Sequence, residues 1–163
     1  MNARILQFIG VFVLSLFSVA TQAEGWACTH GQTANIEYID RVETLDRVHI
    51  GWGLDFDQKP GLYNWIHISP PSVHGAFARY VALQFWLGSI DADVNKVHVY
   101  NLGEKIKSFD DLPGYSQGWH TEVFDLGSDM PISAVNLAVE IGAGVESMSH
   151  QFIFTGACVY LKP

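Results

Sequence analysis

Apolar residues in this chain recur at every second position far more often than at every third or fourth. Between positions 135 and 141 every odd position is Val, Leu or Ile, while Asn136 and Glu140 stand between them. Gly, Pro, Asn or Asp interrupts such runs every eight to twelve residues or so, about the turn spacing of a β-sandwich. A strand that has one face in the core and the other in water produces this alternation. The sequence therefore predicts an all-β fold, a sandwich or barrel.

The alternating runs predict strands at residues 33–39, 62–69, 79–87, 94–100, 119–126, 134–141 and 149–161. In the last run Ile153, Val159 and Leu161 oppose further apolar side chains such as Phe152 and Tyr160. We therefore predict that it is a central strand covered on both faces. The segments 51–61, 70–75 and 113–118 are rich in turn formers and are predicted to be loops.

The N-terminal segment, residues 1–23, has the composition of an export signal. Arg4 precedes an apolar run that ends at Ala20, and Thr21 and Ala23 place small residues before a cleavage point. The run is too short to cross a membrane comfortably. We predict cleavage after Ala23, one domain at 24–163, secretion to the periplasm or the extracellular space, and no membrane insertion after cleavage. An uncleaved membrane anchor is the alternative.

Two cysteines, Cys28 and Cys158, stand near the two ends of the predicted domain. Export would bring both to an oxidising compartment, and they lack the close spacing of a metal or redox motif. We therefore predict a disulfide, which requires Cα atoms within about 7 Å of each other. The first and last strands are then neighbours. The predicted fold is a single antiparallel β-sandwich, jelly-roll-like, with these two strands adjacent and disulfide-linked.

The charge balance excludes one large class of partner. The chain has 9 Lys and Arg against 17 Asp and Glu, a formal net charge of −8, and no basic run. Nucleic acids and anionic membranes are bound through clustered Lys and Arg. We therefore predict no nucleic-acid partner.

Ser116 stands in the pentapeptide Gly-Tyr-Ser-Gln-Gly, which matches the G-x-S-x-G pattern of a hydrolase nucleophile. In that pattern the serine sits on a sharp turn between a strand and a helix. Residues 119–126 are instead predicted to be a strand. We therefore expect Ser116 to lack the structural context of a nucleophile.

Metal motifs are incomplete in this chain. Asp91, Asp93 and Asn95 imitate the opening of a calcium loop, but a lysine stands at the glycine position of the EF-hand and a leucine at its glutamate position. The seven histidines show none of the short spacings of a zinc site. We predict no metal site and no cofactor; calcium held loosely by Asp55 or Asp57 is the alternative.

Aromatic side chains supply the candidate binding residues, because exposed rings can stack on sugars or peptides. A tryptophan lies in the loop Gly-Trp-Gly at 51–53 and another follows Gly118. Two histidines alternate with apolar residues on their strands, and should share a half-wet face with neighbouring aromatic residues. Purely structural histidines would instead be buried and bonded to the backbone. The predicted binding residues are Trp52, Trp65, His67, His98, Tyr100 and Trp119.

Several short segments carry a resemblance to a known family. They are Thr-His-Gly at 29–31, Arg-Val-Glu at 41–43, Pro-Gly at 60–61, Asn-Trp-Ile-His-Ile at 64–68 with Pro70, Val-His-Val-Tyr at 97–100, Phe-Asp-Asp-Leu at 109–112 and Gly-Ala-Cys at 156–158. Together they resemble a bacterial domain of unknown function, found as exported or free-standing proteins. The chain departs from that family at three positions. The family has Phe at the positions of Ile66 and Ile68, and an acidic residue at the position of Asn101. The resemblance implies a β-sandwich and assigns no catalytic residue.

Three functions are compatible with these features. The first is an exported, non-enzymatic module that binds a glycan or a protein through aromatic residues. The second is a small hydrolase or lyase that uses His67 and His98 in a cleft. The third is a structural or oligomer-forming protein. Convergence of the two histidines and a carboxylate in one pocket would favour the enzyme.

Overall fold

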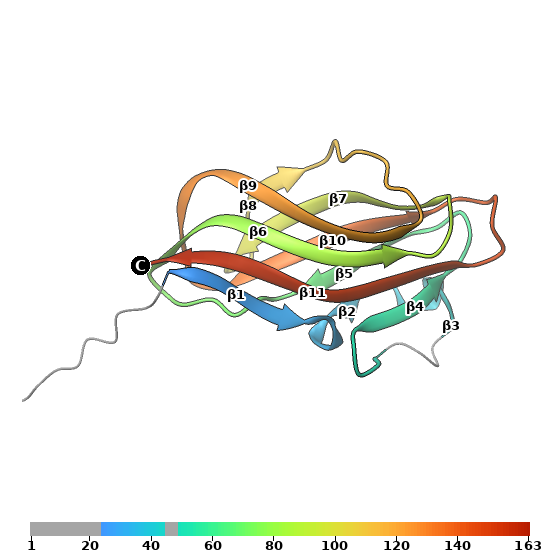
Figure 1. Ribbon diagram of the computed structural model, residues 1–163, viewed down its shortest axis with the longest axis horizontal. Coiled ribbons are helices and arrows are strands. Elements are labelled where there is room, and N and C mark those ends of the chain that lie inside the picture. The colour runs from blue at the N-terminus through green and yellow to red at the C-terminus, as the bar shows by residue number, and fades with distance from the viewer. Residues whose placement is uncertain (1–23, 45–48) are drawn as a thin grey trace, which may run out of the picture.

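Two antiparallel sheets pack face to face in the part of the chain that the computed structural model describes, residues 24–44 and 49–163 (Figure 1). The predicted antiparallel sandwich is confirmed. The predicted signal segment, 1–23, lies outside the described residues. No helix among the described residues is long and apolar enough to cross a membrane.

The sheets have six and five strands. The six-stranded sheet contains, in order, β3 (Val42–Thr44), β4 (Leu54–Gln58), β11 (His150–Lys162), β6 (Ala76–Leu87) and β9 (Gly118–Ile132), and β1 (Gly25–His30) also pairs with β11. The five-stranded sheet contains, in order, β2 (Asn35–Ile36), β5 (Tyr63–Ile68), β10 (Val135–Ala143), β7 (Ala92–Asn101) and β8 (Glu104–Phe109). Figure 1 shows these two layers, with β11 in red between β1 in blue and β6 in green.

The core lies between the layers and is built from the inward positions of each alternating strand. Val81, Leu83 and Phe85 of β6 are at most 1% exposed, as the alternation predicts. The rings of Phe56 and Phe152 stack with their centroids 5.9 Å apart. Many of the outward side chains are exposed or half-buried, so both outer faces offer surfaces to a partner.

The predicted disulfide is confirmed. Cys28 of β1 stands directly opposite Cys158 of β11, and the two sulfur atoms are 2.06 Å apart. The first and last strands are therefore neighbours, as expected. The bridge projects from the outer side of the six-stranded sheet.

Strand β11 is central, and it is covered on both faces as predicted only near its start, where Phe152, Ile153 and Phe154 are at most 4% exposed. Phe154 and Ala157 are both buried, because a bulge at Thr155 adds one residue to the alternation. After the bulge the inner face continues with Val159, while Tyr160 points outward and is half-buried. The strand is therefore covered on both faces before the bulge, and after it has one core face and one half-buried outer face that carries Tyr160.

Two glycines fill the junction at this bulge. Strands β1 and β4 lie end to end along one edge of β11, and Gly31 and Gly53 sit between them. A Cβ atom on either glycine would overlap the carbonyl oxygen of Phe154. The Gln32 side chain donates a hydrogen bond to the carbonyl oxygen of Ile50 at 2.6 Å. These contacts hold the 50–53 loop against β11.

Two sequence-based assignments, one of a strand and one of a loop, are wrong. The strand predicted at 33–39 is reduced to β2, because the Asn64 side chain accepts a hydrogen bond from the Tyr38 amide (3.0 Å) and donates one to the Tyr38 carbonyl (2.9 Å). The segment predicted as a loop at 51–61 contains β4. Two aspartates alternate with Leu54 and Phe56 in this strand, and they were interpreted as turn residues. The strand predicted after Ser116 is confirmed as β9, so the serine lies before a strand and not before a helix.

Candidate functional site

The six predicted binding residues divide between the two outer faces of the sandwich. Trp65 and His67 of β5 and His98 and Tyr100 of β7 lie on the outer side of the five-stranded sheet, which we call the polar face. Trp52 and Trp119 meet at one end of the outer side of the six-stranded sheet, which we call the hollowed face.

On the polar face the two histidines belong to one row across the sheet. His67 and His98 stand opposite Ala138 of β10, on either side of it. The Trp65 ring lies 5.0 Å from the His98 ring, and the Tyr100 ring lies 6.4 Å from it. The structure thus brings all four predicted residues of this face together, in the sheet that faces β6.

The polar groups of the polar face are paired with one another. His67 Nε2 lies 2.9 Å from a carboxylate oxygen of Glu37, and His98 Nε2 lies 3.1 Å from one of Asp110. Hydrogen bonds from Tyr38 and then His67 hold the pKa of Glu37 below its usual range. Neither histidine is bonded to the backbone, and neither lines any of the three hollows described below.

The carboxylate beside His98 has a second partner. The Ser108 hydroxyl donates to Asp110 at 2.6 Å, and this bond, followed by that from His98, lowers the pKa of the Asp110 carboxyl. In the next row Lys96 donates to Glu140 at 2.9 Å. The polar face therefore contains three side-chain pairs, His67 with Glu37, His98 with Asp110 and Lys96 with Glu140.

On the hollowed face the outward side chains form rows that cross β9, β6, β11 and β1. Strand register places Thr121 beside Gln84, the next row contains Val123, Ala82, Cys158 and Cys28, and the row after it contains Asp125, Tyr80, Tyr160 and Trp26. Two hollows lie in succession along these rows.

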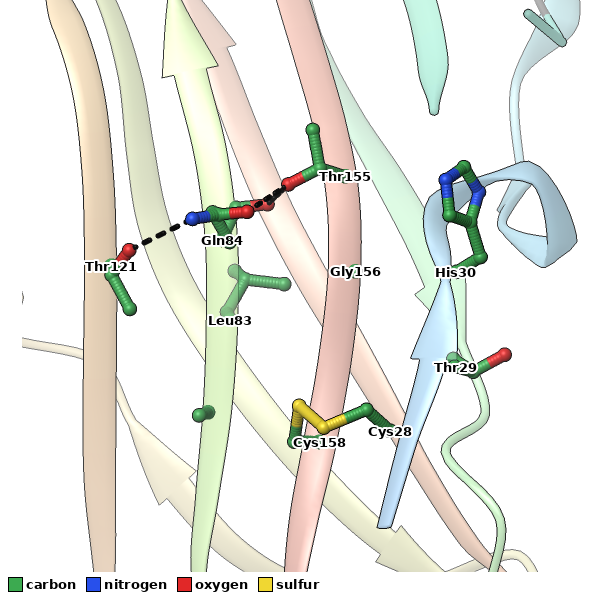
Figure 2. A pocket seen from close by; sticks show the side chains of 10 residues that line it. Cys28, Thr29, His30, Leu83, Gln84, Thr121, Thr155, Gly156 and Cys158 are labelled. Carbon is green, nitrogen blue, oxygen red and sulfur yellow. Dashed lines mark hydrogen bonds between the residues drawn. A yellow bond between two sulfur atoms is a disulfide. The ribbon is translucent and has the colours of Figure 1, made fainter. Parts of the chain in front are cut away.

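The first hollow has a volume of about 400 Å³, and its mostly apolar lining contains a row of uncharged hydrogen-bonding side chains. The Gln84 amide donates to the Thr121 hydroxyl at 3.3 Å, and the Thr155 hydroxyl donates to the Gln84 amide oxygen at 2.6 Å (Figure 2). The disulfide forms part of the lining, and His30 stands on the far side of β11 from Gln84 (Figure 2). A glutamine has two amide hydrogens and a two-lone-pair oxygen. The row therefore keeps donors and acceptors for a ligand.

The second hollow has a volume of about 430 Å³ and an aromatic wall. The ring of Tyr160 lies 5.3 Å from that of Trp26 and 6.2 Å from that of Tyr80. Trp26 is 46% exposed, so its ring remains available. The Tyr160 hydroxyl donates to Glu24 at 3.3 Å.

The opposite end of the hollowed face carries tryptophans. Trp119 is two positions from Thr121 on β9 and stands beside Trp86 of β6. The 50–53 loop brings Trp52 to it, with ring centroids 6.2 Å apart, and Trp52 and Trp119 are 48% and 56% exposed. Large aromatic side chains exposed at both ends of a hollow that contains hydrogen-bonding side chains form a surface on which a flat, hydroxyl-bearing ligand can stack.

A third hollow of about 170 Å³ is lined by Asp91, Asp93 and Asn95, the residues that imitate a calcium loop. Asp91 accepts the backbone N–H groups of Glu146 and Ser147 at 2.6 and 3.3 Å. Burial opposes ionisation of Asp91, but these bonds outweigh it and lower its pKa. Among the described residues no group of three or more His, Cys, Asp or Glu side chains is placed to hold a metal ion.

The carboxylates considered as loose calcium ligands lie on a strand and not in a loop. Asp55 and Asp57 of β4 are 4% and 7% exposed. Gln151 donates to Asp55 at 2.7 Å. Asp55 is therefore committed to a neighbouring strand.

Sequence reasoning missed most of the hollowed face. The missed residues are Trp26, Tyr80, Gln84, Thr121, Thr155 and Tyr160. A signal was present, because the even positions from 80 to 86 on β6 and the odd positions from 119 to 123 on β9 all point outward. The order of the strands in the sheet brings these residues together, and the sequence alone does not show that order.

Comparisons with known proteins define a class of fold. No family model matches the chain, and no curated protein matches it. A low-affinity xylan-binding module of family CBM86 from Roseburia intestinalis has 11% sequence identity and a TM-score of 0.50, over 84% of this chain and 96% of that one. The chain is therefore a β-sandwich with the fold of that module.

Two further solved structures are similar over most of their length. A CBM61 module in complex with β-1,4-galactotriose has 11% identity and a TM-score of 0.46, over 84% of this chain and 87% of that one. A family 35 carbohydrate-binding module from Clostridium thermocellum has 8% identity and a TM-score of 0.43, over 81% of this chain and 96% of that one.

Proposed function

We propose that this protein is an exported, non-enzymatic module that binds a glycan on the hollowed face. The observation that carries the proposal is the row Thr121–Gln84–Thr155, which lies in the first hollow between exposed aromatic rings. Sugars present flat apolar ring faces and hydroxyls that both donate and accept. The side chains of this face match both properties.

Three further observations support the proposal. The fold is shared with a module whose reported ligand is xylan. The disulfide fits an oxidising compartment, in line with the predicted export signal at 1–23. The histidines considered for catalysis are paired with carboxylates on the polar face and do not line the hollows of the hollowed face. Membership of the bacterial family named above is part of the same proposal.

The test is binding of the exported, disulfide-bonded protein to a polysaccharide panel, measured by affinity electrophoresis on xylan, β-glucan, mannan and galactan. We expect retardation by at least one of them. Trp119→Ala and Gln84→Ala should each weaken that binding about tenfold or more, which corresponds to about 1.4 kcal/mol.

Trp65→Ala on the polar face is the matched control, because it removes the same ring from the opposite surface. It should bind as the unmodified protein does. Loss of binding in Trp65→Ala with full binding in Trp119→Ala would place the site on the wrong face and refute the proposal.

A further inference from the structure

The charges around the hollowed face restrict the kind of glycan that fits it. We infer that the ligand is an uncharged chain of several sugar units that lies along the strands, from Trp119 toward Tyr160. This inference rests on the proposed function and names the ligand class of the same site.

The first hollow has a neutral lining. Its lining residues are Cys28, Thr29, His30, Ala82, Leu83, Gln84, Thr121, Thr155, Gly156 and Cys158, which include no Asp, Glu, Lys or Arg. The His30 Nδ1 atom accepts the backbone N–H of Gln32 at 3.2 Å. The hollow therefore offers hydrogen bonds to a ligand and no Lys or Arg side chain to pair with an anion.

Lys162 lines the second hollow and the Arg79 guanidinium lies 5.6 Å from the ring of Tyr80, another lining residue; both cations already have acidic partners. Arg79 Nε lies 2.8 Å from a carboxylate oxygen of Asp125, and Lys162 Nζ lies 3.1 Å from one of Asp129. The same hollow also contains Glu24. A uronic acid, sulfate or phosphate group would lose its water here without gaining a free cation, in a chain whose net charge is −8. Anionic glycans are therefore disfavoured.

The length of the face excludes a single sugar as the full ligand. Trp86 and Tyr80 are six positions apart on β6. At a rise of about 3.4 Å per residue the two aromatic ends are about 20 Å apart, a distance that a monosaccharide cannot bridge. The polar row at Gln84 lies between these ends. An oligosaccharide can contact all three places at once when its chain runs parallel to the strands.

The test is calorimetric titration of the disulfide-bonded protein with defined probes. The neutral probes are β-1,4-linked gluco-, xylo-, manno- and galactohexaose and their dimers, and the anionic probes are C6-oxidised glucohexaose and hexagalacturonate. We expect a neutral hexamer to bind at least tenfold more tightly than its dimer and than either anionic hexamer. Added salt should leave its affinity unchanged, because no ion pair forms.

Thr121→Lys adds a cation to an exposed position of the first hollow and sharpens the test. It should raise the affinity for the anionic hexamers several-fold, whereas Thr121→Ser should not. An anionic hexamer that binds the unmodified protein as tightly as the neutral ones, and is lost in Trp119→Ala, would overturn the inference and leave the proposed function standing. A dimer as tight as its hexamer would overturn the extended geometry. Failure of every probe and every polysaccharide would refute the proposed function itself.

Discussion

The hollowed face and the polar face both carry tryptophan, tyrosine and histidine side chains, but their polar groups have different partners. On the polar face His67, His98 and Lys96 each lie within hydrogen-bond distance of a carboxylate. On the hollowed face Gln84 bonds two threonine hydroxyls and keeps spare donors and acceptors. The unfilled hydrogen-bonding capacity of the hollowed face is therefore what distinguishes it as our candidate binding surface.

The two faces also differ in shape. Two hollows of about 400 and 430 Å³ follow each other on the hollowed face. The rings of the polar face fill the space between the side chains, with Trp65 packed on His98 at 5.0 Å. The first surface suits a ligand, and the second contributes to the stability of its sheet. The predictions below separate these two roles.

The largest effect is expected from the disulfide, which belongs to the hollowed face alone. Replacing Cys28 and Cys158 together by Ala should lower the free energy of unfolding by about 2 to 5 kcal/mol, the usual range for a small exported domain. The strand β1 that the bridge holds also carries Trp26 and lines both hollows. Urea unfolding measures the change, and glycan affinity should fall with it in the folded variant.

Retention of full stability in this double variant would mean that the pairing of β1 with β11 suffices without the bridge. Thiol titration of the unfolded, unmodified protein is the companion measurement. It should find no free thiol in the absence of reductant.

The next largest expected effect is a difference in stability loss between two tryptophan variants, one on each outer face. Trp65→Ala should cost about 1 to 2 kcal/mol of unfolding free energy, because it removes a half-buried ring and its contact with His98. Trp119 is 56% exposed, so Trp119→Ala should cost less than about 1 kcal/mol. Thermal unfolding and glycan titration of both variants give the comparison. Equal stability losses would contradict the distinction between the faces.

The smallest expected effect is the pH dependence of the stability that one carboxylate of the polar face, Asp110, contributes. The folded pKa of Asp110 lies below its unfolded value, because Ser108 and then His98 stabilise the carboxylate. Between the folded and the unfolded pKa the unfolded state binds more protons, so the stabilisation is fully present above the unfolded value of about 4 and is lost as the pH falls from there through the lower folded pKa. Asp110→Asn should therefore be less stable than the unmodified protein at neutral pH, and the difference should vanish in acid.

Melting temperatures at neutral pH and below pH 4 or so test this prediction, since model carboxyls titrate at about 4. Asp111→Asn is the control, because Asp111 is the exposed neighbour of Asp110. A difference between Asp110→Asn and the unmodified protein that persists in acid would show that the carboxylate charge is not its source.

Much of the fold could be predicted because alternation is a local property. Val81, Leu83 and Phe85 show which side of β6 is the core, and that assignment is correct. Prediction failed where a contact from elsewhere changes the backbone. Asn64 binds both backbone groups of Tyr38 and ends a strand that the pattern continues.

The candidate site was predicted only in part for the same reason. Trp52 and Trp119 were identified, but their meeting depends on a loop held by Gly31 and Gly53 against Phe154. The four residues predicted as one patch on β5 and β7 do lie together, because each strand places them on its outward side. Their pairing with Glu37 and Asp110 was not visible in the sequence.

The sequence by itself determined the all-β class, the core face of strands with a clean alternation such as β6 and β10, and the pairing of Cys28 with Cys158. These follow from side-chain period and from a count of two cysteines. Only the tertiary structure decided which outward side chains share a surface. Thr121, Gln84 and Thr155 come from three strands far apart in the chain, and strand order alone brings them into one row. Their position beside one another, with hydrogen-bonding capacity to spare, is therefore a property of the folded sheet.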